Sequence, residues 1–242
     1  MSGVRSQCDV HAVILAAGIG RRLQPLTDET PKTLLEVGDR PILGHILDAL
    51  VAADYERVTV VTGFEADQIR RFCGKYDELA FEYVHSEAFR ETNNSYSLWL
   101  ARERLQEGFT LVNSDTLFPP ECLDRLREHD GSALVVDAAK ELDEEEMKVR
   151  VEDGRVVGVG KELERADGEY IGVCKFDPEG SEALVGHLDD LVEAGRTNEW
   201  YEAAFDRLVP DHPLGIVEVH DDWIEIDDRD DLRAARRLRG ED

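Results

Sequence analysis

The stretch VILAAGIGRRLQPLTDETPKTLLEV, residues 13–37, joins an apolar run to a loop that contains two glycines, two arginines and a lysine. The apolar run is typical of a parallel strand that is buried on both faces. Gly18 and Gly20 allow the backbone to turn sharply and to bring N–H groups close to a ligand. Arg22 offers a forked pair of donors for phosphate oxygens, and Lys32 adds a point charge. We therefore predict an anion site, suited to a triphosphate, at the end of this first strand.

Composition restricts the class of protein. The 242 residues are 42% hydrophobic, as expected for a globular protein, and the formal net charge is −26. Such acidity repels polyanions, so we expect no nucleic-acid partner, and no apolar run is long enough for membrane insertion. We interpret the acidity as halophilic adaptation to a high-salt cytoplasm, with a generic acidic surface as the alternative.

The first ten residues lack the apolar segment of a secretory signal, which predicts a cytoplasmic protein. Four cysteines are scattered without metal-binding spacing, and we expect them to be reduced. They are Cys8, Cys73, Cys122 and Cys174.

Strand-like and helix-like segments alternate through the first 140 residues. Apolar runs predict strands at 11–17, 57–63, 79–85, 109–115 and 132–139. Amphipathic segments predict helices at 41–53, 65–76, 93–105 and 119–129. This alternation indicates an α/β fold with a Rossmann-like open, mostly parallel sheet that is flanked by helices on both faces.

After residue 140 the pattern changes, and residues 148–161 predict a β-hairpin with Asp153-Gly154 as its turn. Further strands are expected at 168–176, 215–220 and 223–227, and helices at 179–194, 199–208 and 228–238. We predict a single domain, residues 1–242, whose C-terminal half adds a small antiparallel β lid. Residues 1–140 form its nucleotide-binding half, and residues 141–242 form its acceptor-binding half with the second metal carboxylates.

Two other interpretations of the glycine-containing loop fit less well. A dinucleotide fingerprint requires a third glycine where this chain has Leu23, and no acidic residue ends the second predicted strand. A solvated basic loop is the remaining alternative, but two arginines and a lysine around glycines and prolines in so acidic a chain argue against it.

Residues 15–43, LAAGIGRRLQPLTDETPKTLLEVGDRPIL, closely resemble the signature of nucleotidyltransferases that join an NTP to a phosphorylated sugar or alcohol. The pattern LAAG-x-G-x-R-L-x-P-L-T, P-K-x-L-L-x-V and P-[IL]-[IL] is matched at every position. The resemblance implies that Arg22 and Lys32 are the catalytic cations, with Lys32 near the reacting α-phosphate. It implies that the nucleotide is bound by Leu15, Ala16, Ala17, Gly18, Gly20, Arg22 and Lys32.

Nucleotidyl transfer brings two polyanions together, so we expect Mg²⁺ as the cofactor. Asp115 ends the predicted strand FTLVNSD, and strand alternation places Glu225 and Asp227 of WIEIDD on one face. The resemblance implies that all three residues bind the metal, although Ser114 stands where many sugar enzymes have glycine. The alternatives are a turn or helix cap for Asp115 and surface acidity for Glu225 and Asp227.

Three shorter segments, at 91–101, 168–176 and 223–232, resemble the phosphocholine, inositol-phosphate and 2-aminoethylphosphonate cytidylyltransferases. This resemblance implies CTP as the nucleotide, with Asn94 and Ser97 near its base or ribose. Helix capping is the alternative for the asparagines of this segment.

The phosphorylated acceptor needs cations of its own. Lys148 and Lys161 bracket the predicted hairpin, and the resemblance places Lys161 near the phosphates, with surface solvation as the alternative for both. Tyr201 and Glu199 are further candidates for acceptor binding, and Glu202 lies on the same predicted helix as Glu199. An aromatic cage for a quaternary ammonium, which would use residues such as Tyr201, is a further hypothesis.

The predicted activity is therefore Mg²⁺-dependent transfer from CTP to a small phosphorylated or phosphonate alcohol, with release of pyrophosphate. A sugar-1-phosphate nucleotidyltransferase that uses UTP, dTTP or GTP is the alternative enzyme. A non-catalytic nucleotide-binding subunit is the alternative class, and the retained Lys32, Asp115 and Asp227 disfavour it. The sequence leaves the oligomeric state open, with a homodimer as one option.

Overall fold

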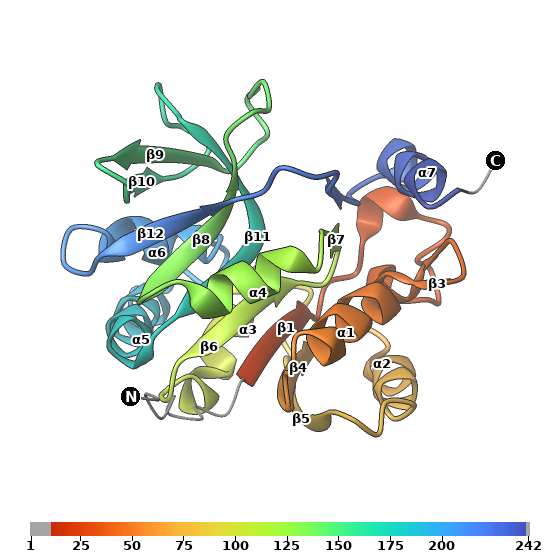
Figure 1. Ribbon diagram of the computed structural model, residues 1–242. Helices are drawn as coiled ribbons and strands as arrows, with labels where there is room; N and C mark the ends of the chain where they lie inside the picture. The colour runs from red at the N-terminus through yellow and green to blue at the C-terminus, as the bar shows by residue number, and fades with distance from the viewer. Residues whose placement is uncertain (1–10, 241–242) are drawn as a thin grey trace, which may run out of the picture.

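A computed structural model describes residues 11–240. Cys8 and the first ten residues, for which no secretory signal was expected, lie outside the described residues. A nine-stranded sheet forms the centre of the molecule (Figure 1). From one edge to the other its strands are β5 (Ala80–His85), β4 (Arg57–Thr62), β1 (His11–Ala16), β6 (Phe109–Asn113), β11 (Gly168–Phe176), β8 (Ser132–Asp137), β12 (Leu214–Glu218), β10 (Arg155–Val159) and β9 (Lys148–Glu152).

The first four strands in this order run parallel, as predicted. Every residue of β1 is buried, with Ala12 and Ile14 in one hydrophobic cluster and Val13 in the other. Because the carboxyl ends of parallel strands lie at one edge of the sheet, the loops after β1 and β6 lie side by side. The pairing of Leu15 with Asn113 fixes this arrangement.

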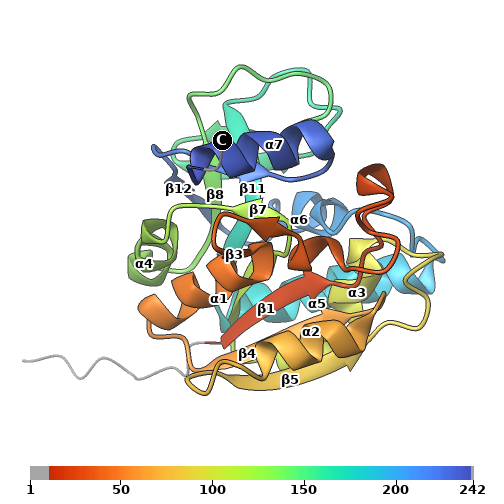
Figure 2. The ribbon, with the colours of Figure 1, turned by 90° about the vertical axis from the view of Figure 1, so that its right-hand side faces the viewer.

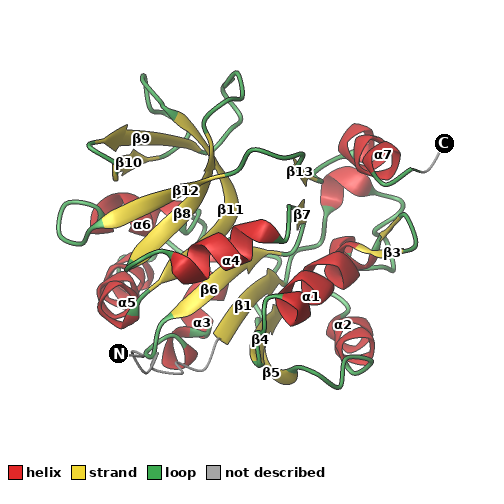
Figure 3. Cartoon of the chain, in the orientation of Figure 1, coloured by secondary structure: helices red, strands yellow, loops and turns green. Residues whose placement is uncertain are grey.

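Helices cover both faces of the sheet, which confirms the predicted α/β class (Figure 3). Buried side chains of α1, α2 and α4 join the hydrophobic cluster on one face, and those of α3, α5 and α6 join the cluster on the other. The helices are α1 (Ile42–Ala52), α2 (Ala66–Cys73), α3 (Asn94–Leu100), α4 (Glu121–Glu128), α5 (Pro178–Glu193), α6 (Glu202–Leu208) and α7 (Arg229–Leu238).

The second half of the sheet is mixed in direction. Strand β11 runs antiparallel between β6 and β8, whereas β8 and β12 are parallel. The predicted hairpin forms as β9 and β10, and both residues of its turn, Asp153 and Gly154, have positive φ. Because β9 also pairs with β11, this hairpin continues the main sheet at its edge. Both predicted halves of the chain therefore contribute strands to one sheet.

Short elements complete the site and differ most from the prediction. The strand expected at 223–227 is only two residues long, β13 (Ile224–Glu225), and it pairs with β7 (Thr116–Leu117). No sequence pattern predicted β7 or the small ribbon of β2 (Glu36–Val37) and β3 (Arg40–Pro41). Helix α7 packs beside β2, whose partner strand β3 is labelled below α7 in Figure 2. No helix within residues 11–240 is both long and apolar enough to cross a membrane.

Candidate active site

The loop after β1 is held in shape by contacts within the loop itself. Gly20 adopts φ +68°, and a Cβ at this position would lie 2.9 Å from the Cβ of Lys32. The Thr27 hydroxyl donates to the Gly20 carbonyl at 2.7 Å. A Cβ at Gly18 would contact nothing within 4 Å, so the backbone there is open to a ligand. A glycine at position 20 therefore lets Lys32 pack closely against the loop, and a glycine at position 18 leaves the backbone accessible to a ligand.

The amine of Lys32 joins the beginning of the chain to its two later carboxylates. Its Nζ lies 2.9 Å from Asp115 Oδ2 and 2.7 Å from Asp227 Oδ1. Arg22 Nη1 lies 3.0 Å from the other oxygen of Asp227. Burial alone would lower the pKa of Lys32, but the two carboxylates outweigh burial and raise that pKa. Lys32 is therefore a fixed positive charge in this structure.

Glu225 completes a cluster of three carboxylates. Carboxylate oxygens of Asp115, Glu225 and Asp227 lie within 4.8 Å of one another. The pairing of Glu225 with Thr116 brings this group together, because Thr116 directly follows Asp115. Desolvation in the crowded cleft and the neighbouring carboxylates raise the pKa of Glu225 to about 8. The structure thus brings together all three residues that the sequence predicted as metal ligands.

This donor set fits a hard divalent cation. Asp115 Oδ1 is buried and has no hydrogen-bond partner among the described residues. A buried carboxylate oxygen without a partner is costly, and a cation would satisfy it. Three carboxylates beside an open cleft leave room for phosphate and water oxygens, which Mg²⁺ ordinarily recruits.

A cavity of about 330 Å³ opens at the carboxyl ends of β1 and β6. Asp115, Glu225 and Asp227 border it, and Asn113 and Ser114 line it between the strands. All nine residues predicted to bind the nucleotide line this cavity, namely Leu15, Ala16, Ala17, Gly18, Gly20, Arg22, Lys32, Asn94 and Ser97.

Two asparagines at the start of α3, Asn93 and Asn94, have structural roles. The side chain of Asn93 caps the helix by accepting from the Asn94 backbone N–H at 2.8 Å. Asn94 Oδ1 accepts from the backbone N–H of Tyr201 at 2.8 Å. Helix capping thus belongs to Asn93, whereas Asn94 joins α3 to the segment before α6 while it lines the cavity.

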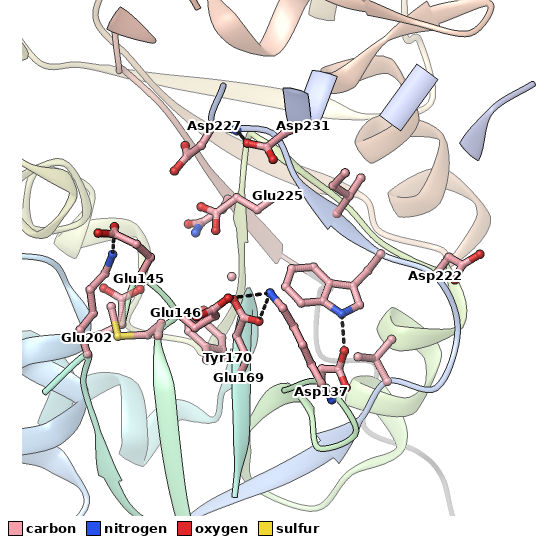
Figure 4. Close-up of a pocket in the computed structure, with 18 of the residues that line it drawn as sticks. Asp137, Glu145, Glu146, Glu169, Tyr170, Glu202, Asp222, Glu225, Asp227 and Asp231 are labelled. Carbon is pink, nitrogen blue, oxygen red and sulfur yellow. Dashed lines mark hydrogen bonds and ion pairs between the residues drawn. The ribbon is translucent and has the colours of Figure 1, made fainter. Parts of the chain in front are cut away.

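A second and larger cavity of about 780 Å³ shares Arg22, Asn94, Glu225 and Asp227 with the first. Figure 4 shows its labelled carboxylates projecting from several different elements. Of the predicted acceptor residues, Lys161 lines this cavity. The two cavities therefore meet at the carboxylate cluster.

Three of the predicted acceptor residues do not line this cavity. Lys148 does not line the cavity, since its amine donates to the Lys161 carbonyl at 2.8 Å. Tyr201 is fully buried, and its hydroxyl donates to Asn113 Oδ1 at 3.0 Å, so it supports the cavity from behind. Glu199 precedes α6 and pairs with Arg196 at 3.1 Å.

The structure adds cavity residues that the sequence analysis missed or left as alternatives. Lys140 pairs with the buried Glu169 at 2.7 Å and lies 5.3 Å from the ring centroid of Trp223. The Trp223 indole donates to Asp137 at 2.8 Å (Figure 4). Glu202 also lines the cavity. A lysine in an acidic loop carries no motif, so no local signal identified Lys140.

Comparison with known proteins agrees with this geometry. Residues 12–217 match the MobA-like NTP transferase domain. The chain belongs to the MobA-like NTP transferase family. Open α/β sheets bind ligands outside the carboxyl ends of their strands, which is where the first cavity opens.

Two family members show how far the similarity extends. The bifunctional IPC transferase and DIPP synthase of Aquifex aeolicus is 30% identical over 93% of this chain, and the chain spans about half (51%) of that relative. The CTP:phosphoglutamine cytidylyltransferase of Campylobacter jejuni is 25% identical over 93% of this chain and 98% of that relative.

Solved structures show the same fold. The phosphocholine cytidylyltransferase of Streptococcus pneumoniae matches with a TM-score of 0.78 at 23% identity, over 95% of this chain and 99% of that chain. The inositol-1-phosphate CTP transferase of T. maritima matches with a TM-score of 0.78 at 21% identity, over 96% and 97%.

Proposed function

We propose that this NTP transferase family member joins CTP to a small phosphorylated or phosphonate alcohol in a Mg²⁺-dependent reaction. A phosphate or phosphonate oxygen of the acceptor attacks the α-phosphorus of CTP. A new P–O bond forms there, the bond from the α-phosphorus to the bridging oxygen breaks, and pyrophosphate leaves with that electron pair. The acceptor oxygen is already ionised near neutral pH, so no general base is needed.

The observation that carries this proposal is the convergence of Lys32 on Asp115 and Asp227 between two cavities. When a triphosphate arrives, Lys32 and Arg22 can exchange their carboxylate partners for phosphate oxygens. Asp115, Glu225 and Asp227 would hold the Mg²⁺, which supplies charge neutralisation between the nucleotide and the acceptor. Catalysis then consists of positioning and electrostatic stabilisation.

The choice of CTP and a phosphoalcohol rests on the relatives. Besides those above, a 2-aminoethylphosphonate cytidylyltransferase of Lancefieldella rimae is 35% identical over 42% of this chain. A UTP–glucose-1-phosphate uridylyltransferase of Haloferax volcanii is 34% identical over 45% of this chain, which keeps the sugar-phosphate enzyme as the second candidate.

A panel of four NTPs with phosphoalcohol, phosphonate and hexose-1-phosphate acceptors tests the proposal through pyrophosphate release. We expect preference for CTP with a non-sugar acceptor and a requirement for Mg²⁺. Asp115→Asn should lower turnover by at least about 100-fold, whereas Asp124→Asn on the exposed side of α4 should not change it. Preference for UTP and a hexose phosphate would favour the second candidate, and full activity of Asp115→Asn would refute the metal assignment.

A further inference from the structure

Asn113 occupies the junction of the two cavities. It is the last residue of β6, it precedes Asp115 by two residues, and it lines both the smaller and the larger cavity. Strand β6 pairs with β1 on one side and with β11 on the other, so the backbone at this position is held in the middle of the sheet. The side chain of Asn113 therefore projects from a fixed point between the two candidate substrate sites.

One end of the Asn113 amide is held from behind by Tyr201. Tyr201 is fully buried, and its hydroxyl donates to Asn113 Oδ1 at 3.0 Å. Its backbone is tied to α3, because its N–H donates to Asn94 Oδ1 at 2.8 Å. Its ring packs against Tyr170 and Phe205, with ring centroids 6.3 and 5.0 Å away. A hydroxyl that is held on so many sides fixes the orientation of the amide that it contacts.

The other end of this amide is an unused donor. Asn113 Nδ2 has no hydrogen-bond partner among residues 11–240 and is not one of the buried unpaired atoms there, so it is accessible. A Cβ at Gly172 would lie 2.5 Å from Nδ2, so this end of the amide packs over the backbone of a glycine with φ +82°. Gly172 lines the larger cavity and not the smaller one. The free N–H groups of Asn113 therefore lie on the side of the larger cavity.

The charges of the larger cavity make such a donor useful to an anionic group. The lysine and arginine side chains that line this cavity are Arg22, Lys140 and Lys161, and each forms an ion pair with a carboxylate. A phosphoryl group that enters an acidic cavity gains from a donor that is not already engaged. An amide N–H that water can reach supplies this donor at little cost to the free protein.

We propose that Asn113 Nδ2 donates a hydrogen bond to a phosphoryl or phosphonyl oxygen of the acceptor, and that Tyr201 is a positioning residue that holds the amide in the required orientation. This inference rests on the function proposed above and adds a donor to its site. The hydrogen bond holds the acceptor at the junction of the cavities, beside the carboxylate cluster, where its oxygen can attack the α-phosphorus of CTP.

The variant Asn113→Leu keeps the size of the side chain and removes the donor. With CTP, Mg²⁺ and the acceptor that gives the highest turnover in the panel above, we expect kcat/KM for the acceptor to fall by about 10- to 100-fold. The Kd for CTP without acceptor, measured by calorimetry, should change by less than about 2-fold. Asn198→Leu makes the same change at an exposed position outside both cavities and is the matched control. An unchanged kcat/KM for the acceptor, or a loss that appears in CTP binding instead, would overturn the inference.

A double-mutant cycle separates positioning from a general structural role. Tyr201→Phe removes only the hydroxyl, and we expect it to lower kcat/KM for the acceptor by about 3- to 10-fold while the near-UV circular dichroism stays native. In an Asn113→Leu background the same change should have no further effect, because no amide is left to orient. Tyr55→Phe is the matched control, since Tyr55 is also buried and its hydroxyl contacts Thr110 at 2.7 Å, outside both cavities. Equal losses in both backgrounds, or no loss in Tyr201→Phe alone, would refute the positioning role of Tyr201.

The outcomes also separate this inference from the function on which it rests. If the wild type is active and folded Asn113→Leu uses the acceptor equally well, only the inference fails. If the wild type releases no pyrophosphate from any NTP with any acceptor, the proposed function fails and the inference fails with it.

Discussion

Replacing Lys32 by methionine should change metal binding and turnover in opposite directions. The Lys32 amine lies 2.7–2.9 Å from two of the three carboxylates that we assign to the metal. Without a nucleotide, this ammonium already neutralises part of the cluster and opposes a divalent cation. In Lys32→Met the three carboxylates lose that compensation, so a cation should bind more tightly to the nucleotide-free protein.

The magnitude follows from Coulomb's law. Two unit charges about 4 Å apart interact by about 1 kcal/mol in water and about 4 kcal/mol at an effective dielectric constant near 20. Asp227 is 42% exposed, which places the site toward the screened end of this range. We expect the binding free energy of Mn²⁺, used as a probe of the proposed Mg²⁺ site, to become more favourable by about 2 kcal/mol in Lys32→Met. This corresponds to a roughly 30-fold lower Kd. Turnover should fall by about 100- to 1000-fold, because the transition state loses a positive charge.

Titration of nucleotide-free protein with Mn²⁺ by calorimetry or electron paramagnetic resonance measures the first effect, and pyrophosphate release measures the second. Lys75→Met is the matched control, because Lys75 is exposed and its amine lies 4.7 Å from the Phe72 ring centroid. Unchanged or weaker Mn²⁺ binding in folded Lys32→Met would refute the idea that this amine and the cation compete for the same carboxylates.

Three further predictions concern stability and reactivity. Burial raises the pKa of Glu202 from 4.5 to about 7, so between these pH values the folded state holds a proton that the unfolded state has lost, and the free energy of unfolding falls as pH rises. The free energy of unfolding of Glu202→Gln, measured in urea, should therefore exceed that of the wild type by about 3 kcal/mol at pH 8 and nearly equal it at pH 4. Cys73, Cys122 and Cys174 are free and buried, and burial raises the pKa of each thiol, so their reaction with a thiol reagent should require unfolding. With a net charge of −26, the unfolding midpoint in urea should rise between 0.1 and 2 M KCl as salt screens repulsion, and a flat or falling midpoint would contradict the halophilic interpretation.

The sequence predicted which edge of the sheet carries the candidate site because the signals for that edge are local. A continuous apolar run specifies β1, and the rule that ligands bind at the carboxyl ends of parallel strands places Lys32 and Asp115 together. Strand alternation placed Glu225 and Asp227 on one side, although only two residues there form a regular strand. The side chains still alternate beyond this short strand, because Ile226 is fully buried between Glu225 and Asp227.

The residues that line the larger cavity were harder to predict, because long-range packing decides which side chains reach its wall. Tyr201 could line a pocket or fill a core on sequence grounds, and its hydrogen bonds to Asn113 and Tyr170 are visible only in three dimensions. The insertion of β11 between β6 and β8 produces this arrangement, since it carries Tyr170 into the centre of the sheet. No local period in the sequence encodes which strands become neighbours.

The two cavities differ in charge, and this difference supports the proposed placement of one substrate in each cavity. In the smaller cavity three cations, Arg21, Arg22 and Lys32, balance the three clustered carboxylates, whereas the larger cavity carries an excess of carboxylates. A triphosphate placed in the larger cavity would meet an excess of negative charge, whereas in the smaller cavity it would meet those three cations. The shared carboxylates at the boundary are the one place where both substrates approach the same anionic groups. Under the proposed function, a divalent cation bound there would convert that boundary from repulsive to attractive for two phosphoryl groups at once, which would let an acidic cavity serve an anionic reaction.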